Sequence, residues 1–298
     1  MELDQVEAFV EVVRQEGFTR AAAALHLSQP AISRRIRLLE RELGAPLFER
    51  LPRGVALTDA GRAFLPHARA VLASMRDGLD AVGAVLGTSR GTVTLAVVGT
   101  LASTPLADRL RTFREAHPAV DLRLRTALSA EVSALVLGGD AALGLRYRVD
   151  PHPDLVSSVV HDERLVPVCA PGHRLAAKRR VAAAELAGER WIGFPRRPAG
   201  AIEPYVVAFD ELLAASGLGT PELVPVDSLT AQKRMVEAGF GLAVLPESGI
   251  DDELRTGTLH VLPVPALRAT IPVALIHRRR AFQGGATRAL AAALTAWA

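Results

Sequence analysis

Three short helical segments near the N-terminus, the last of them capped at both ends, constrain the fold more than any other feature. Residues 3–16 place apolar side chains at helical spacing, and Thr19 is the expected N-cap of a second, short helix. Ser28 is placed to cap a third helix. Pro30 falls in its first turn, where a missing N–H costs little, and Gly44 ends it. This order predicts a helix-turn-helix.

The third helix has an apolar face and a polar face. Ile32, Ile36 and Leu39 should pack inward. The outward stripe consists of Gln29, Ser33, Arg34 and Arg37. The major groove of B-DNA admits one α-helix, whose N-terminal residues face the base edges. Residues 29–53 hold six arginines and three glutamates, whereas residues 1–16 hold five acidic residues and one arginine. Taken alone, these arginines fit a solvated helix face equally well.

A hairpin and a long helix follow. Residues 46–57 read as two short strands around 52–54, which predicts a wing. Thr58 is placed to cap a helix through about residue 86, whose apolar residues alternate at spacings of three and four, as in a coiled-coil seam. The seam residues expected to dimerise are Leu65, Leu72, Met75, Leu79 and Val82. Residues 87–91 break the helix and predict a linker.

After residue 91 the pattern changes to alternating strands and helices. The first expected elements are strands at 92–98, 120–126 and 141–145 and helices at 104–116 and 131–137. A similar series runs from about 164 to 262, with a helix at 229–238 and a strand at 242–245. The C-terminal segment adds a strand within 271–280 and a helix at 286–297. Such a series predicts a parallel sheet with right-handed crossovers.

Short motifs follow one another in a fixed order along the chain. Residues 18–65 contain SQPAIS at 28–33, LFER at 47–50 and LT-AG at 57–61. Later pieces are HP at 117–118, PGH at 171–173 and VEAGFG at 236–241 with LP at 245–246. With these motifs the chain resembles the LysR-type transcriptional regulators, sharply over residues 1–65 and more loosely over the remainder.

The resemblance implies an α plus α/β fold: a winged helix-turn-helix, a long dimerisation helix, and a periplasmic-binding-protein-like domain of two α/β subdomains. The expected domains are 1–58 for DNA binding, 59–91 for the dimerisation helix and hinge, and 92–298 for effector binding. Subdomain one would combine 92–162 with 267–298, subdomain two would span 163–266, and a ligand cleft would lie between them. The implied function is a sequence-specific DNA-binding regulator whose DNA contacts respond to a small-molecule effector.

The DNA contacts expected of such a regulator divide by what they touch. Base contacts are expected from Gln29, Pro30, Ser33 and Arg34. Phosphate contacts, which position a protein without reading sequence, are expected from Thr19, Ser28 and Arg37. Arg53 at the wing tip is expected to enter the minor groove, because narrow A·T-rich segments attract guanidinium groups.

The effector site is expected outside the carboxyl ends of the parallel strands. Thr100, Ser103 and Thr104 lie where the strand at 92–98 turns into a helix, and hydroxyls and free N–H groups there favour an anion. Ser129 and Ser228 are further candidates. Each of these residues is also explained as a helix cap.

Two arginines are candidates for a carboxylate clamp on the effector. Arg146 follows the strand at 141–145, and Arg196 lies in a proline-bounded loop. We therefore expect a small anionic metabolite as the effector. Two alternatives stay open: both arginines are ordinary surface side chains, and Leu101 with Ala102 suits an apolar effector better.

Other function classes find little support in the sequence. It contains no GxSxG, HExxH or P-loop motif and no GxGxxG after a strand, and its eight histidines lack ligand spacing. No enzymatic activity, cofactor or metal is therefore expected. The single cysteine, Cys169, lies in the apolar run LVPVC and is expected to be a buried structural thiol rather than a redox sensor.

Location and partners follow from the same reasoning. No stretch approaches about 18 apolar residues, and the acidic N-terminus is unlike a secretory signal, so a cytoplasmic, nucleoid-associated protein is expected. A solute-binding protein of a transporter is disfavoured by the missing signal and by the N-terminal 90 residues. The expected partners are double-stranded DNA with operator half-sites, a small-molecule effector, further copies of the chain in a homodimer or homotetramer, and RNA polymerase.

Overall fold

The computed structural model divides the chain into two units. The first comprises Met1–Ser89 together with Leu137–Asp140 and Arg280–Gly284, and the second comprises the remaining residues. The structure describes residues 1–50, 54–85, 92–196, 203–219 and 221–295. The predicted linker at 87–91 lies outside the described residues. Within the described ranges, no helix is long and apolar enough to cross a membrane.

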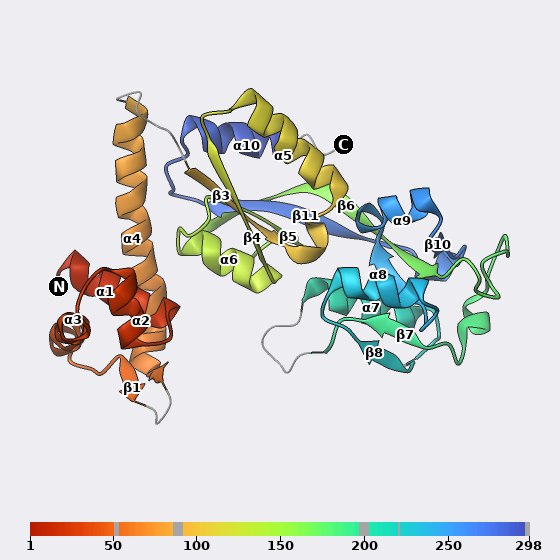
Figure 1. Cartoon of the computed structure of the whole chain (residues 1–298), viewed down its shortest axis with the longest axis horizontal. Helices are drawn as coiled ribbons and strands as arrows, with labels where there is room; N and C mark the ends of the chain where they lie inside the picture. Colours follow the sequence, from red (N-terminus) through yellow and green to blue (C-terminus); the bar gives the residue numbers. More distant parts are fainter. Residues whose placement is uncertain (51–53, 86–91, 197–202, 220, 296–298) are drawn as a thin grey trace. The chain divides into compact units, whose positions relative to one another are not determined.

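The first unit follows the order predicted from the sequence (Figure 1). Its described elements are α1 (Leu3–Arg14), α2 (Phe18–Ala24), α3 (Gln29–Leu43), the antiparallel strands β1 (Phe48–Arg50) and β2 (Val55–Leu57), and α4 (Asp59–Val85). Ser28 Oγ accepts a hydrogen bond from Ala31 N at 3.3 Å at the start of α3, and Gly44 ends this helix in the left-handed conformation. Thr58 caps α4 in the same way, through Gly61 N at 3.0 Å. The cap predicted at Thr19 is wrong, because α2 already begins at Phe18.

An aromatic cluster joins the helices of the first unit to the hairpin. The ring of Phe9 lies 5.3 Å from that of Phe48 and 5.4 Å from that of Phe64. The inward face of α3 is buried as predicted, at Ile32, Ile36 and Leu39. These contacts fix α3 by its apolar face and leave its polar face at the surface.

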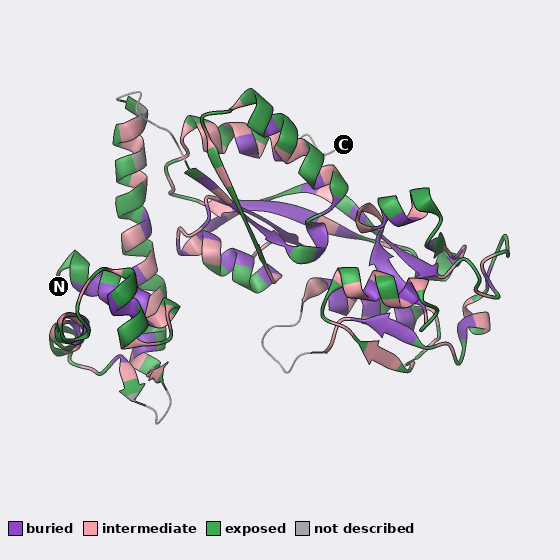
Figure 2. Cartoon of the chain, viewed as in Figure 1, coloured by how far each residue is buried: buried purple, intermediate pink, exposed green. Residues whose placement is uncertain are grey.

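The predicted seam on α4 divides into two parts. Leu65 and Leu72 are half-buried and pack against the core of the first unit. Met75, Leu79 and Val82 are exposed, with 46%, 64% and 58% of their surface accessible. Figure 2 shows the change from buried to exposed along this helix.

The second unit is built from a mixed sheet and its covering helices. The described strands are β3 (Thr92–Val98), β4 (Asp121–Ala127), β5 (Leu143–Tyr147), β6 (Leu155–Cys169), β7 (Trp191–Gly193), β8 (Leu223–Pro225), β9 (Ala243–Pro246), β10 (His260–Val261) and β11 (Ala269–Arg278). The described α-helices are α5 (Thr104–Ala116), α6 (Ser129–Leu137), α7 (Pro204–Ala215), α8 (Leu229–Glu237), α9 (Asp251–Thr256) and α10 (Gly285–Thr295). Short 3₁₀ turns are η1 (Gly99–Leu101), η2 (Ala183–Leu186), η3 (Glu247–Gly249) and η4 (Pro265–Leu267).

The sheet is only partly parallel. Its strand order is β10-β6-β11-β5-β3-β4, and β9 also pairs with β6. β3 runs parallel to β4 and β5, as predicted. β11 runs antiparallel to β5 and β6, and β9 and β10 run antiparallel to β6, so the parallel prediction is wrong for these strands. Because β11 lies between β5 and β6 and runs antiparallel to both, these two strands are parallel to each other.

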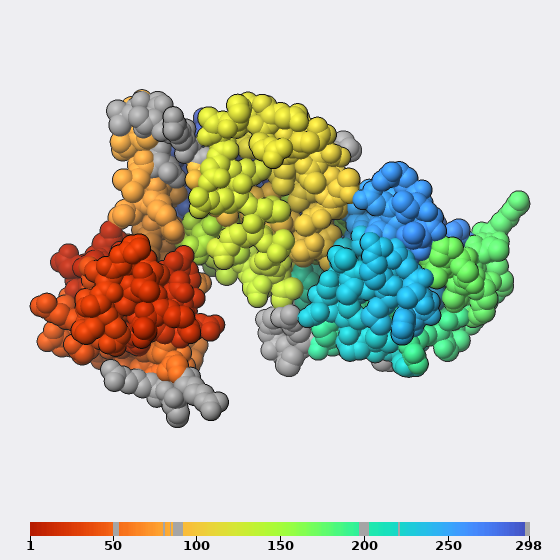
Figure 3. Space-filling model, viewed as in Figure 1, coloured from red at the N-terminus to blue at the C-terminus, as the bar shows by residue number. Residues whose placement is uncertain are grey.

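Two lobes share the long strands β6 and β11. We call residues 92–162 and 267–295 the first lobe and residues 163–266 the second lobe. In the first lobe, α5 and α10 cover one face of the sheet and α6 covers the other (Figure 1). The second lobe contains the parallel pair β7–β8, and the two lobes form adjoining masses in Figure 3. The pairing of β6 with β11 shifts register between Val273 and Ala274.

Candidate functional site

The polar face of α3 is the candidate DNA-reading surface of the first unit. Gln29, Pro30, Arg34 and Arg37 are exposed along it. Ser33 is only 9% exposed, and its Oγ accepts a hydrogen bond from Gln29 Nε2 at 3.0 Å. Ser33 therefore orients the Gln29 amide rather than presenting its own hydroxyl. Thr19 and Ser28 are also exposed.

The arginines of α3 have different neighbours. Arg35 forms an ion pair with Asp4 at 3.1 Å, which holds it toward α1. Arg34 and Arg37, together with Arg41, line a hollow of about 700 Å³ that ends at Pro46. Glu40 lies in the same hollow, where its carboxylate accepts a hydrogen bond from Leu47 N at 2.8 Å and so fixes the start of the hairpin. The side chain of Arg53, predicted for the wing tip, lies outside the described residues.

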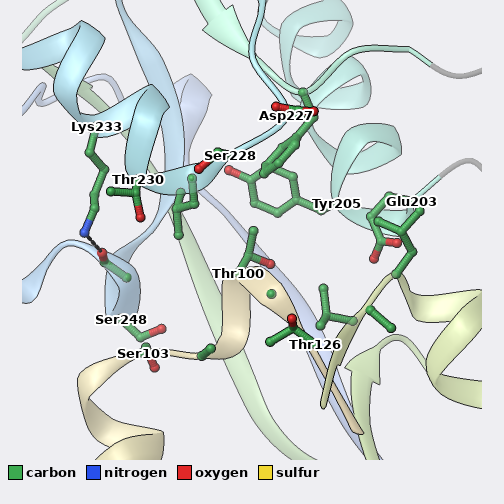
Figure 4. A pocket seen from close by; sticks show the side chains of 18 of the residues that line it. Thr100, Ser103, Thr126, Glu203, Tyr205, Asp227, Ser228, Thr230, Lys233 and Ser248 are labelled. Carbon is green, nitrogen blue, oxygen red and sulfur yellow. Dashed lines mark hydrogen bonds between the residues drawn. The ribbon is translucent and has the colours of Figure 1, made fainter. Parts of the chain in front are cut away.

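A cavity of about 570 Å³ lies between the two lobes of the second unit (Figure 4). The turn from β3 through η1 into α5 contributes Thr100, Ala102, Ser103 and Thr104. The end of β4 and the start of α6 contribute Thr126, Ala127, Leu128 and Glu131. The second lobe contributes Phe194, Glu203, Tyr205, Asp227, Ser228, Thr230, Lys233, Ser248 and residues 251–253. A ligand in this cavity contacts both lobes.

Four predicted effector residues line this cavity. The hydroxyl of Thr100 is 2.9 Å from the Tyr147 hydroxyl, which is buried behind it. Ser103 lines the cavity, and its buried Oγ has no hydrogen-bond partner in the described part of the chain. Thr104 begins α5, and Ser228 Oγ caps α8 through Ala231 N at 3.4 Å.

Three other predicted effector residues do not line the cavity, because the chain's own carboxylates bind them. Ser129 donates both its N–H and its hydroxyl to Glu203. Arg196 pairs with Asp210 at 2.6 Å, and this hydrogen bond raises the pKa of the guanidinium. Arg146 is buried and pairs with Asp150.

Arg146 is part of a closed network behind the cavity. It pairs with Asp150 and donates a hydrogen bond to Ser133 Oγ at 3.1 Å. Burial raises the pKa of Asp150, but the hydrogen bonds from Ser133 and His152 and the charge of Arg146 outweigh it and lower the pKa overall. Arg146 and Arg196 each pair with a carboxylate of the chain and neither lines the cavity, so they do not form the predicted carboxylate clamp there.

The cavity lining is acidic. Lys233 is its one basic residue among the described lining residues, and it pairs with Glu253 at 2.8 Å and donates to the Gly249 carbonyl at 3.0 Å. Six carboxylates line the same space: Glu131, Glu203, Asp227, Asp251, Asp252 and Glu253. The pKa of Asp251 is raised by burial and by the neighbouring charges of Glu247 and Asp252. These residues give the cavity a negative potential.

Several of these lining residues were missed from the sequence. Phe194 and Asp227 each follow closely after a strand of the parallel pair β7–β8, and Glu203 and Tyr205 lie at the start of α7. Thr100 was predicted because ligands bind beyond the carboxyl ends of parallel strands. The same rule applies to Phe194 and Asp227. β7 and β8 are three residues long, so their strand pattern is too short to recognise.

Comparison with known proteins extends over the whole chain. A family model for the bacterial regulatory helix-turn-helix protein of the lysR family matches residues 3–62, and one for the LysR substrate binding domain matches residues 86–298. A RuBisCO operon transcriptional regulator from Allochromatium vinosum is 31% identical over 93% of this chain and 90% of its own length.

Solved structures agree with the family models. A full-length OxyR variant from Pseudomonas aeruginosa has a TM-score of 0.75 at 21% identity, covering 99% of this chain and 94% of that one. Full-length CbnR in complex with its target DNA has a TM-score of 0.66 at 25% identity, covering 100% of both chains. The chain belongs to the LysR family of transcriptional regulators.

Proposed function

We propose that this transcriptional regulator reads DNA with the N-terminal half of α3 and changes its DNA contacts when a small molecule occupies the cavity. The observation that carries the proposal is the cavity, because its lining comes from both lobes. A ligand that fits one arrangement of the lobes better than another shifts the population toward that arrangement. Thr100, Ser103, Thr104 and Ser228 are the proposed effector contacts on the hydroxyl-lined side.

The proposed DNA contacts follow the exposure of the side chains. Gln29, Pro30 and Arg34 contact bases, and Ser33 positions the Gln29 amide for this contact. The proposed phosphate contacts are Thr19, Ser28 and Arg37, with Arg53 in the minor groove.

We assign dimerisation to the exposed part of α4. Met75, Leu79 and Val82 expose apolar surface at seam spacing, which a second copy of the helix would cover. Leu65 and Leu72, on the same helix, pack against the core of the first unit and hold α4 in place. A homodimer, or a homotetramer formed from two of them, would bind paired half-sites. RNA polymerase is the further partner of a promoter-bound regulator, and the cytoplasmic nucleoid is the place where such a protein acts.

Two measurements test the effector role together. Genome-wide mapping of bound DNA identifies the operator, and metabolites handled by the neighbouring gene's product are then screened for thermal stabilisation of the full chain. Ala102 is exposed and lines the cavity, so Ala102→Trp should fill it without disturbing the core. We expect this variant to lose the stabilisation while retaining operator binding. Stabilisation that persists in Ala102→Trp would place the effector elsewhere.

A further inference from the structure

The charge of the cavity determines which class of effector it accepts. The described lining residues include six carboxylates and one lysine. Glu253 pairs with that lysine and Asp252 pairs with Arg255, which leaves four carboxylates without an ion pair among the described residues: Glu131, Glu203, Asp227 and Asp251. A carboxylate ligand would enter this field without a free cation to pair with, whereas a cation would gain from each nearby carboxylate. We propose that the effector carries an ammonium or guanidinium group, an inference that rests on the proposed function of the cavity.

The best place for that cation is beside Tyr205. Figure 4 shows Asp227 above its ring and Glu203 to the right of it. The Tyr205 hydroxyl donates to the Val244 carbonyl, which fixes the ring, and Phe194 stands edge-on to it at 5.6 Å. Tyr205 is only 3% exposed, so its ring backs this part of the cavity, and the two carboxylates supply the charge-assisted hydrogen bonds to a cation.

The hydrogen bonding of Asp227 and Glu203 agrees with a cation bound between them. Asp227 is exposed and lines the cavity, and its side chain makes no hydrogen bond or ion pair with the described residues. Among the described residues, Glu203 accepts side-chain hydrogen bonds only from Ser129. A carboxylate offers about four lone-pair sites, so Glu203 retains capacity for a donor on the ligand.

Two further acceptors at the other end of the cavity are buried and unpartnered. Ser103 is 8% exposed and Glu253 is 6% exposed, and neither Ser103 Oγ nor Glu253 Oε2 has a hydrogen-bond partner among the residues that the structure describes. Buried polar atoms without partners are costly, and both residues line the cavity. Ligand N–H or O–H groups satisfy both atoms, whereas a carboxylate oxygen has no proton to give Glu253 Oε2.

The proposed effector is therefore an amine or guanidine of metabolite size. Its cationic end lies between Glu203 and Asp227, and hydrogen-bond donors at its other end reach toward Ser103 and Glu253. A second amino group suits that end as well, because the potential is negative along the whole cavity.

Calorimetric titration of the full-length protein with four probes of similar length tests the class: 1,4-diaminobutane, agmatine, butane-1,4-diol and succinate. We expect binding of at least one of the two cations, weakening with added salt, and none by succinate. Asp227→Asn should weaken that binding by about tenfold or more, as expected for losing a charge-assisted hydrogen bond. Glu203→Gln should do the same. Glu211→Gln is the matched control, because Glu211 lies on α7 and outside the cavity lining.

The outcomes separate the effector class from the site. Succinate binding without cation binding, or no binding by either cation, overturns the cationic class. If succinate binding is then lost in Ala102→Trp, the cavity remains the effector site. Cation binding that neither Asp227→Asn nor Ala102→Trp weakens overturns both the class and the site.

Discussion

The carboxylate of Glu203, in the second lobe, accepts two hydrogen bonds from Ser129 in the first, one from its hydroxyl and one from its backbone N–H at 2.9 Å. Ser129 begins α6, and the free N–H groups at a helix N-terminus attract negative charge. A side chain of the protein thus binds the hydroxyl and N–H of Ser129, a residue that was a candidate contact for the effector. The contact also bridges the two lobes beside the cavity.

Ser129→Ala tests how much this bridge contributes to stability. The substitution removes the hydroxyl donor to a charged acceptor, so we expect the free energy of unfolding to fall by about 1–3 kcal/mol in urea denaturation. Ser216→Ala is a suitable control, because the Ser216 hydroxyl bonds only within its own helix end. Equal stability of Ser129→Ala and the wild type would mean that the bridge is not maintained in solution.

Arg34→Ala and Arg37→Ala should affect DNA binding differently. Arg34 lies nearer the N-terminal end of α3, and its loss should reduce discrimination between operator and mutated operator by about 1–3 kcal/mol. Arg37→Ala should weaken binding similarly on all sequences and lower the salt dependence. Fluorescence anisotropy at several salt concentrations measures both. Equal, sequence-independent losses in the two variants would contradict the assignment of Arg34 to a base.

Leu79→Asp combined with Val82→Asp should produce a folded monomer, measured by light scattering. Both side chains are exposed, so the charges oppose association without disturbing a core. Leu72→Asp should instead destabilise the first unit, because Leu72 packs against its core. If the double variant is still a dimer, the dimer interface lies outside this part of α4.

Cys169 should resist alkylation in the folded protein. Burial raises the pKa of its thiol from 9.0 to about 11, so the reactive thiolate is scarce at pH 8. The folded state holds this proton more tightly than the unfolded state. The thiol's contribution to stability is therefore complete below about pH 9 and is lost as the pH rises toward 11. Iodoacetamide labelling followed by mass spectrometry should detect modification at pH 8 only after unfolding in urea. Rapid labelling without urea would show that the buried site opens.

The first unit could be predicted closely because its signals are local. Ser28 caps α3 through a residue three positions away, and Gly44 ends it through its own backbone conformation. The inward face of α3 follows from helical periodicity alone. Thr19 was misplaced because Gly17 already serves as the N-cap of α2.

The cavity could be predicted only in part, because the decisive contacts depend on how the chain folds back. Arg148 adopts a positive φ of 59°, and the turn around it returns Asp150 to Arg146. The sequence does not mark the positive φ itself, since Arg148 is neither glycine nor asparagine. Arg196 pairs with Asp210, which lies on α7, 14 residues further along the chain, and helical spacing does not connect the two.

The paired strands β6 and β11 run between the lobes and connect them in a way that permits twisting more readily than stretching. Two long hydrogen-bonded strands resist stretching, but a shift in register such as that between Val273 and Ala274 locally increases their twist. Motion of one lobe against the other is therefore easiest as rotation about the strand axis. Such rotation would move the two sides of the cavity in opposite directions along a bound molecule. The first lobe would transmit this shearing motion.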